Sequence, residues 1–224
     1  MVFPTLAVVG SVRWLLETEP LDFAVIYGSQ VSADHSLSDI DILAVSRRVL
    51  GAQSIRVGRF DLTLISPGAL KKACAVLDPP LATEPLLSGK MVFGSRRSFA
   101  SYRKVLTRTR PTEEVTTHML NSSIELLNSG EEYRANGELV AAALSLSFAS
   151  SYAAFALWYA RGRPAATLDT IATGEMDLER LVQHAKDLRS YGSLSQGDFA
   201  RLMSHARVAV RRSLAKARSP PPGH

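Results

Sequence analysis

Cysteine is almost absent from this chain of 224 residues, whose only thiol is Cys74. A single thiol cannot build a disulfide framework within the chain, and it suits a reducing compartment. Cys74 lies in an apolar helical pattern, so we interpret it as a core residue and not as a nucleophile. The sequence also lacks internal repeats, zinc-type cysteine and histidine spacing, and a glycine-rich dinucleotide fingerprint. Because no basic-then-apolar leader with a cleavage site opens it, we expect a cytoplasmic protein.

Acidic side chains are missing from two stretches of the chain. Residues 95–110 contain six basic residues and no acidic ones, and residues 201–224 have the same balance. Between them, residues 111–200 carry 12 acidic and 6 basic side chains. A basic block can bind phosphate or nucleic acid, but a solvated face that pairs with the neighbouring acids is the simpler interpretation. Nucleic acid is therefore an open partner that the charge pattern does not favour.

Charged residues of either sign are missing from residues 139–160, a run of 22 positions. This length could span a bilayer. The run is rich in alanine and serine, however, and its flanks are polar, which favours a central buried helix or a subunit interface. We therefore expect no membrane association, and a homodimer through this helix remains open.

Two short apolar runs in the first quarter of the chain frame a polar turn. Residues 23–27 end at Gly28, and Asp41 leads into residues 42–45. Such runs are typical of buried strands. Because alternate residues of a strand point to one face, Asp39 and Asp41 should project together while Ile40 and Ile42 enter the core. Two adjacent carboxylates repel each other unless a cation lies between them, and Mg²⁺ prefers oxygen ligands of this kind.

A third carboxylate, Asp61, lies in residues 57–65, which we predict to be another strand. If this strand lies beside the first two, three carboxylates converge and can hold two metal ions. Gly28 lets the backbone approach a phosphate closely, and the Ser29 hydroxyl adds a hydrogen-bond donor.

This order of features resembles the polymerase-beta-type nucleotidyltransferase superfamily over roughly residues 21–95. The resemblance implies that Gly28 and Ser29 hold the triphosphate of a nucleotide. It also implies that Asp39 and Asp41 bind two Mg²⁺ ions, and that Asp61 completes the metal site and helps to activate an acceptor hydroxyl. The later part of the chain resembles the helical bundles that accompany such domains, including the kanamycin nucleotidyltransferase type.

Many members of that superfamily have a basic residue directly after Gly-Ser, where this chain has Gln30. Another cation must then bind the triphosphate. We predict that Arg96 and Arg97, which open the first basic block, do so, because an arginine fork suits phosphate. The alternatives in sequence are Lys71, Lys72 and Lys90.

The fold we predict is α+β, with a small mixed sheet covered by helices on one face. The nucleotidyltransferase domain should occupy residues 1–94, a helical bundle residues 95–217, and a disordered tail residues 218–224. In the first domain we expect helices at 4–17, 66–77 and near 81–87, with an extended segment at 91–93. In the bundle we expect them at 96–107, 113–133, 139–160, 176–188 and 195–217.

The resemblance implies transfer of a nucleoside monophosphate from an NTP, which we take to be ATP, to an acceptor hydroxyl with release of pyrophosphate. The acceptor is not named by the sequence. Two alternatives remain open. One is a non-catalytic nucleotide-binding or antitoxin-like partner protein, and the other is an RNA-binding or RNA-modifying protein that uses the basic blocks.

Overall fold

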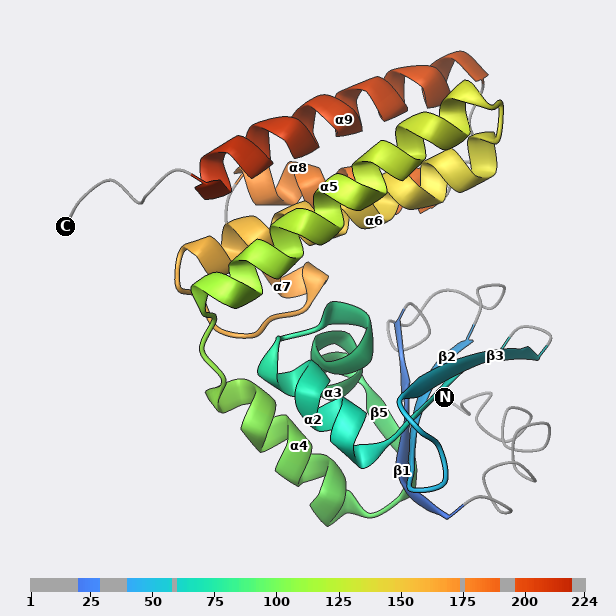
Figure 1. Ribbon diagram of the computed structural model, residues 1–224, viewed down its shortest axis with the longest axis vertical. Coiled ribbons are helices and arrows are strands. Elements are labelled where there is room, and N and C mark those ends of the chain that lie inside the picture. Colours follow the sequence, from blue (N-terminus) through green and yellow to red (C-terminus); the bar gives the residue numbers. More distant parts are fainter. Residues whose placement is uncertain (1–19, 29–39, 58–59, 174–175, 190–195, 219–224) are drawn as a thin grey trace. The chain divides into compact units, whose positions relative to one another are not determined.

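The computed structural model describes residues 20–28, 40–57, 60–173, 176–189 and 196–218 (Figure 1). Ser29, Asp39 and the helix predicted at 4–17 lie outside these ranges. Contacts divide the chain into two compact units, Met1–Thr109 and Arg110–His224. Each unit is described by itself.

The first unit contains a sheet of five strands in the order β3-β4-β2-β1-β5. The strands are β1 Leu21–Tyr27, β2 Ile40–Ser46, β3 Ala52–Val57, β4 Phe60–Ile65 and β5 Lys90–Gly94. β2 and β4 pair in parallel, and the other neighbours pair antiparallel. The predicted small mixed sheet is therefore confirmed.

Helices cover one face of this sheet (Figure 1). They are α2 Pro67–Ala75, the π-helical turn Pro79–Thr83, α3 Glu84–Ser88 and α4 Arg96–Arg108. Ser66 caps α2 by accepting a hydrogen bond from the Ala69 amide at 3.2 Å, with Pro67 at the first helical position as the sequence predicts. Phe23 of β1 makes ring contacts with Phe99 and Tyr102 of α4, with centroids 5.5 and 5.9 Å apart. These contacts fix α4 against the sheet.

The opposite face of the sheet carries a second apolar layer. Its fully or almost fully buried members are Ala24, Ile40, Ile42, Ala44, Leu62 and Leu64. The predicted burial of Ile40 and Ile42 is thus confirmed. Both faces of β2 are apolar over most of its length, so Asp41 is a polar exception at the beginning of a buried strand.

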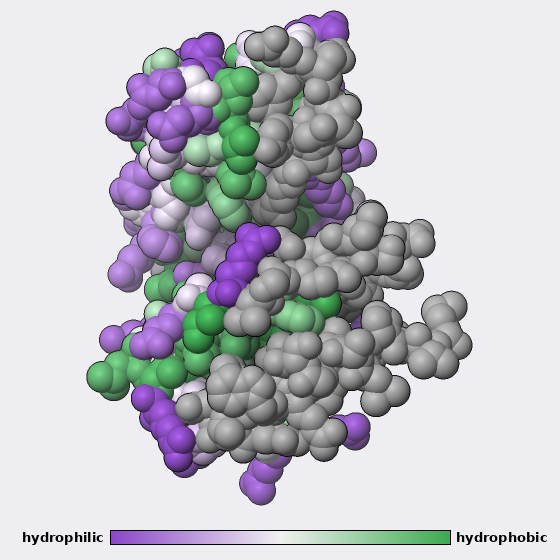
Figure 2. All heavy atoms as spheres, turned by 90° about the vertical axis from the view of Figure 1, so that its right-hand side faces the viewer, coloured by the Kyte–Doolittle hydropathy of each residue, from purple (hydrophilic) through white to green (hydrophobic). Residues whose placement is uncertain are grey.

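The second unit is helical. It contains α5 Glu113–Ala135, α6 Leu139–Ala160, α7 Leu168–Ala172, α8 Met176–Arg189 and α9 Gln196–Arg218. α6 packs against α5, α8 and α9. Its small residues allow close approach, and the hydroxyls of Ser123 and Ser147 bridge helices by donating to the Ala149 and Ala185 carbonyls, each at 2.8 Å. On the face seen in Figure 2, a group of hydrophilic side chains of this unit lies beside a narrower band of apolar ones.

One helix in the described part of the chain, α6, is long and apolar enough to cross a membrane by length and composition. A central helix of a folded core meets the same two criteria, and 61% of the most apolar window of α6 is buried by its neighbours. Length and composition alone do not separate these two cases.

The elements differ from the sequence expectations in two places. The single strand predicted at 57–65 is two strands, because Val57 ends β3 and pairs with Phe60 of β4 across the two residues between them. α7 was not predicted, since five residues show no helical period. α4 lies within the compact unit Met1–Thr109, and its aromatic side chains pack on β1. The division into a domain of residues 1–94 and a helical bundle of residues 95–217 stays a prediction.

Candidate functional site

A row of polar side chains crosses the sheet at the end where β1 finishes and β2 begins. Asp41 of β2 pairs with Asp61 of β4 on one side and with Tyr27 of β1 on the other. Arg56 of β3 pairs with Asp61 in turn. Directly paired residues of neighbouring strands project to the same face. The register therefore places one arginine, two carboxylates and one phenol side by side, and we call these four residues the polar row.

The polar row lies on the face of the sheet that the helices cover. Val25, two positions before Tyr27, and Leu43, two positions after Asp41, are fully buried on this face. Asp41 and Asp61 are half-buried. Their carboxylates thus lie at the margin of an apolar layer, where two like charges are costly without a cation or a donor between them.

Gly28 brings the backbone directly against this row. Its φ of +76° is a left-handed conformation that other residues rarely adopt. A Cβ at this position would collide with the Oδ2 oxygen of Asp41. The positive φ favours glycine here, and any larger residue would also have to displace the Asp41 carboxylate.

The pKa of Tyr27 responds to the negative charge that gathers at the polar row. Burial raises the pKa of the Tyr27 hydroxyl far above its ordinary value, and the charges of Asp41 and Asp61 raise it further. Smaller contributions come from Glu84 and Asp78. Tyr27 therefore remains protonated at physiological pH and can only donate or accept a hydrogen bond there.

Asp78 and Glu84 belong to the helical cover over this end of the sheet. Asp78 caps the π-helical turn by accepting a hydrogen bond from the Leu81 amide at 2.9 Å. Glu84 opens α3, where an acidic residue favourably meets the helix dipole. Both acids thus have local structural roles, and they add negative charge around the polar row.

The predicted metal ligands are described only in part. The structure brings Asp41 and Asp61 together, whereas Asp39 lies outside the described residues, as does Ser29 of the predicted phosphate loop. Among the residues that are described, no group of three or more carboxylate, histidine or cysteine side chains is arranged to hold a metal ion. A pair of neighbouring carboxylates is nevertheless a donor set that suits Mg²⁺ together with substrate phosphates.

The predicted phosphate-binding arginines lie at the other end of the sheet. Arg96 and Arg97 follow β5, and the amide of Ser95 donates to the Asp22 carbonyl at 2.8 Å. Asp22 and Tyr27 are five residues apart on β1, or about 16 Å at the usual rise per residue. The structure therefore does not bring Arg96 and Arg97 to the polar row.

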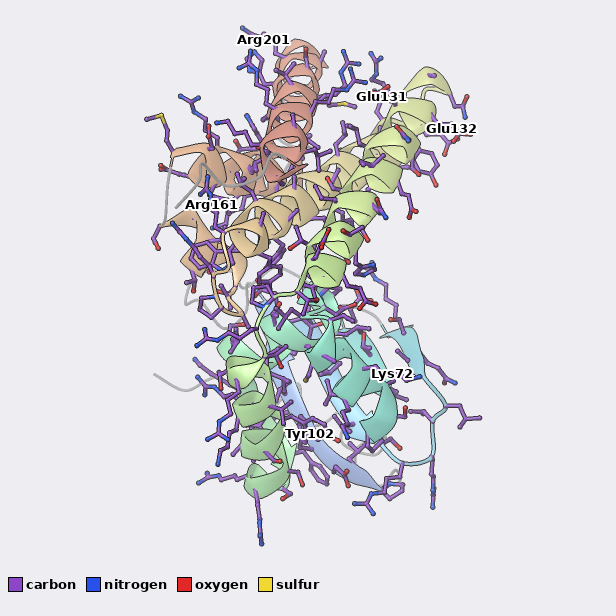
Figure 3. The ribbon with its side chains drawn as sticks, turned by 60° about the vertical axis from the view of Figure 1, so that its left-hand side comes forward. Lys72, Tyr102, Glu131, Glu132, Arg161 and Arg201 are labelled. Atoms are coloured by element: carbon purple, nitrogen blue, oxygen red, sulfur yellow. The ribbon has the colours of Figure 1, made fainter. Side chains whose placement is uncertain are left out.

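The alternative cations are placed differently from one another. Lys71 and Lys72 are exposed on α2, whose buried side consists of Leu70, Ala73 and Cys74, and Lys72 extends from the outer surface of that helix (Figure 3). Lys90 pairs with Ile26, one residue before Tyr27, so it lies at the correct end of the sheet but in a register position of the opposite face.

Sequence reasoning missed two members of the polar row, Tyr27 and Arg56. Arg56 could have been found from Val57-Gly58-Arg59-Phe60, because a two-residue segment that begins with glycine and separates two strand-forming residues is a hairpin signal. A two-residue loop pairs Val57 with Phe60 and hence Arg56 with Asp61. Tyr27 carries no comparable local signal, since its position depends on the antiparallel register of β1 with β2.

Comparisons with known proteins give little that bears on these residues. No protein-family model matches the sequence, and no curated protein matches it. Among solved structures, the chain is similar to a nucleotidyltransferase-like protein from Exiguobacterium sibiricum, with a TM-score of 0.42 and 11% sequence identity. The similarity covers 95% of this chain and 74% of that one. A resemblance this distant carries no conclusion about chemistry.

Proposed function

We propose that this chain is a Mg²⁺-dependent nucleotidyltransferase. In the reaction, a hydroxyl oxygen of an acceptor attacks the α-phosphorus of an NTP, for which we take ATP. The new O–P bond forms as the bond between the α-phosphorus and the bridging oxygen breaks, and pyrophosphate leaves. The observation that carries the proposal is the register that sets Asp41 directly beside Asp61, with Gly28 against Asp41.

The residues of the polar row have separate parts in this proposal. Asp61 accepts the proton of the acceptor hydroxyl, since it is a half-buried carboxylate directly beside Asp41 in the row. Gly28 allows the triphosphate to approach the backbone, and Tyr27, held neutral, donates a hydrogen bond without adding negative charge. Arg56 offsets part of the charge of Asp61 from the neighbouring strand.

Asp41 and Asp61, together with Asp39, would hold the metal. When bound, two Mg²⁺ ions neutralise the triphosphate, lower the pKa of the acceptor hydroxyl and stabilise the leaving pyrophosphate. The donor set fits, because paired carboxylates that repel one another gain most from a divalent cation.

Isothermal titration calorimetry with ATP tests the proposal without knowledge of the acceptor. We expect ATP to bind clearly more tightly with Mg²⁺ than with EDTA, because the carboxylates repel an uncomplexed triphosphate. Asp61→Asn should weaken binding of the Mg²⁺ complex by about tenfold or more, the loss of one charge-assisted contact.

Asp22→Asn is the matched control, since Asp22 lies on the same sheet but at the opposite end of β1, paired with Arg47 at 3.1 Å. Equal ATP affinity with and without Mg²⁺ would contradict the two-metal proposal. If the Mg²⁺ complex binds but no acceptor in a panel of sugars, RNAs and proteins releases pyrophosphate, the non-catalytic nucleotide-binding module becomes the better description.

A further inference from the structure

α4 carries a concentration of positive charge that the polar row does not use. Residues 95–110 contain six basic side chains and no acidic one. Five of them lie on α4 and the sixth, Arg110, follows it. All six are exposed.

The helix is fixed in place by its other side, where Leu106 is fully buried and the rings of Phe99 and Tyr102 contact Phe23. In Figure 3 Tyr102 extends from α4 toward the interior of the unit, away from this charged surface.

Helical spacing gathers these cations onto one outward face. Arg97, Lys104 and Arg108 are separated by seven and four residues, so they form one row along the helix. Arg96 and Arg103, seven residues apart, form a second row beside the first. We call this surface the α4 basic face. Over 13 residues it extends about 20 Å.

The two basic blocks of the chain differ in how their charge is balanced. On α9, Arg207 and Arg211 form ion pairs with Glu131 of α5 at 3.7 and 2.9 Å, and Lys216 pairs with Asp177 of α8. On the α4 basic face, none of the cations forms an ion pair with any residue that the structure describes. The α9 block thus has the solvated, paired character that is usual for surface charge, and the α4 block does not.

We propose that the α4 basic face binds the phosphate backbone of a nucleic acid, without reading its sequence. A row of uncompensated cations neutralises phosphates of a polyanion and displaces the counterions condensed on them, and the release of these counterions drives binding. A membrane surface fits less well, because an interfacial helix needs an apolar face free for lipid. On α4 that face is already packed on the sheet, and only Val105, 45% exposed, remains outside.

This interaction is independent of nucleotidyl transfer. The face is located by the ion-pair pattern and by the side of α4 that packs on β1, and neither depends on Asp41 or Asp61. Binding is therefore to be measured without NTP or metal, so that its failure leaves the proposed reaction untouched, and the converse also holds.

The test is fluorescence anisotropy of the intact protein with a labelled 20-nucleotide single-stranded RNA of mixed sequence, from 50 to 200 mM salt. For single strands the logarithm of the binding constant falls with log salt by about 0.7 per phosphate contact. The triple variant Arg97→Gln, Lys104→Gln, Arg108→Gln should make this slope shallower by about 2 and weaken binding at 50 mM salt by at least about tenfold.

A second triple variant, Arg211→Gln, Arg212→Gln, Lys216→Gln, removes the same charge from α9 and should retain most of the RNA affinity. Circular dichroism melting checks that both triple variants are folded. The double variant Arg97→Lys, Arg108→Lys keeps the positive charge and should bind RNA about as tightly as the wild-type protein. Equal losses in the two triple variants would reduce the effect to net charge and overturn the proposal. So would a wild-type protein that binds phosphatidylserine vesicles or an acidic peptide but not RNA.

Discussion

A single glycine carries two separate constraints at the scale of the residue. Gly28 adopts a positive φ, and it also lies where a side chain would strike the Asp41 carboxylate. Gly51 has a nearly identical φ of +77°, but no atom lies within 4 Å of the position that a Cβ would occupy there. A comparison of the two glycines therefore separates the free-energy cost of the backbone conformation from the cost of crowding the polar row.

Gly28→Ala and Gly51→Ala should each lose about 1–2 kcal/mol of stability, the cost of a left-handed conformation for alanine. Gly28→Ala should lose more, because its methyl group displaces Asp41, and it should also weaken binding of the Mg²⁺ complex of ATP. Urea denaturation and calorimetry measure the two effects. Identical behaviour of the two variants would mean that Gly28 serves only the turn.

Asp41→Asn should abolish nucleotidyl transfer and keep the fold. In the absence of metal it should raise the melting temperature, because it removes one of two neighbouring like charges. Added Mg²⁺ should stabilise the wild-type protein and leave the variant unchanged. Differential scanning fluorimetry with and without Mg²⁺ reports this, with Asp22→Asn as the control. A variant that is destabilised in EDTA would show that Asp41 is held by structural partners instead.

Cys74 should behave as a buried thiol. Burial raises its pKa from the ordinary 9.0 to about 11. Between these values the unfolded state binds fewer protons than the folded state, so this residue lowers the stability as the pH rises through the window. Iodoacetamide at pH 9 should alkylate Cys74 much faster in urea than in the native protein, and Cys74→Ala should flatten the pH dependence. Rapid native alkylation would contradict the burial.

Individual elements differ in how much of them the sequence encodes locally. The run without charged residues predicted α6 at its observed bounds, and α4, α5 and α8 were predicted to within a few residues. The hydrogen bonds of a helix join residues that are close in sequence, so local sequence patterns can predict it. The β3–β4 hairpin was read as one strand, because strand pairing is a relation between distant residues. Asp41 and Asp61 could be predicted as candidates from their own apolar strands. The antiparallel pairing of β5 with β1, which places Arg96 and Arg97 away from them, depends on distant residues and could not be predicted.

The helix caps provide a test at this scale. Ser66 ends the loop after β4 and accepts the Ala69 amide of α2 at 3.2 Å. Ser66→Ala should lose about 1 kcal/mol, because this amide loses its partner. Ser101→Ala, at an exposed position within α4, is the control and should be neutral or slightly stabilising, since alanine is the better helix former. Equal midpoints in urea for all three proteins would show that the cap contributes nothing.

The second unit exposes an apolar line that its own fold leaves uncovered. Val140, Leu144 and Phe148, each four residues apart on α6, are 50, 42 and 44% exposed. α6 carries no charge that would solvate this side or repel a second copy. A self-complementary, uncharged helix face can pair with itself about a two-fold axis through interdigitating rows of this spacing. The homodimer through residues 139–160 therefore stays a prediction with named contacts.

Three partly exposed side chains bury far less than the 1,200–2,000 Å² of a stable interface. We therefore expect a weak, concentration-dependent dimer, seen by sedimentation equilibrium as a mass that rises above 24.3 kDa with concentration. Leu144→Lys with Phe148→Lys should hold the protein at the monomer mass, because two cations on each copy would face each other. Val208→Lys, at an apolar position of α9 that is 42% exposed, changes hydrophobicity in the same way elsewhere and should leave the association intact. A wild-type mass that stays at the monomer value at every concentration would mean that this line of α6 has another occupant.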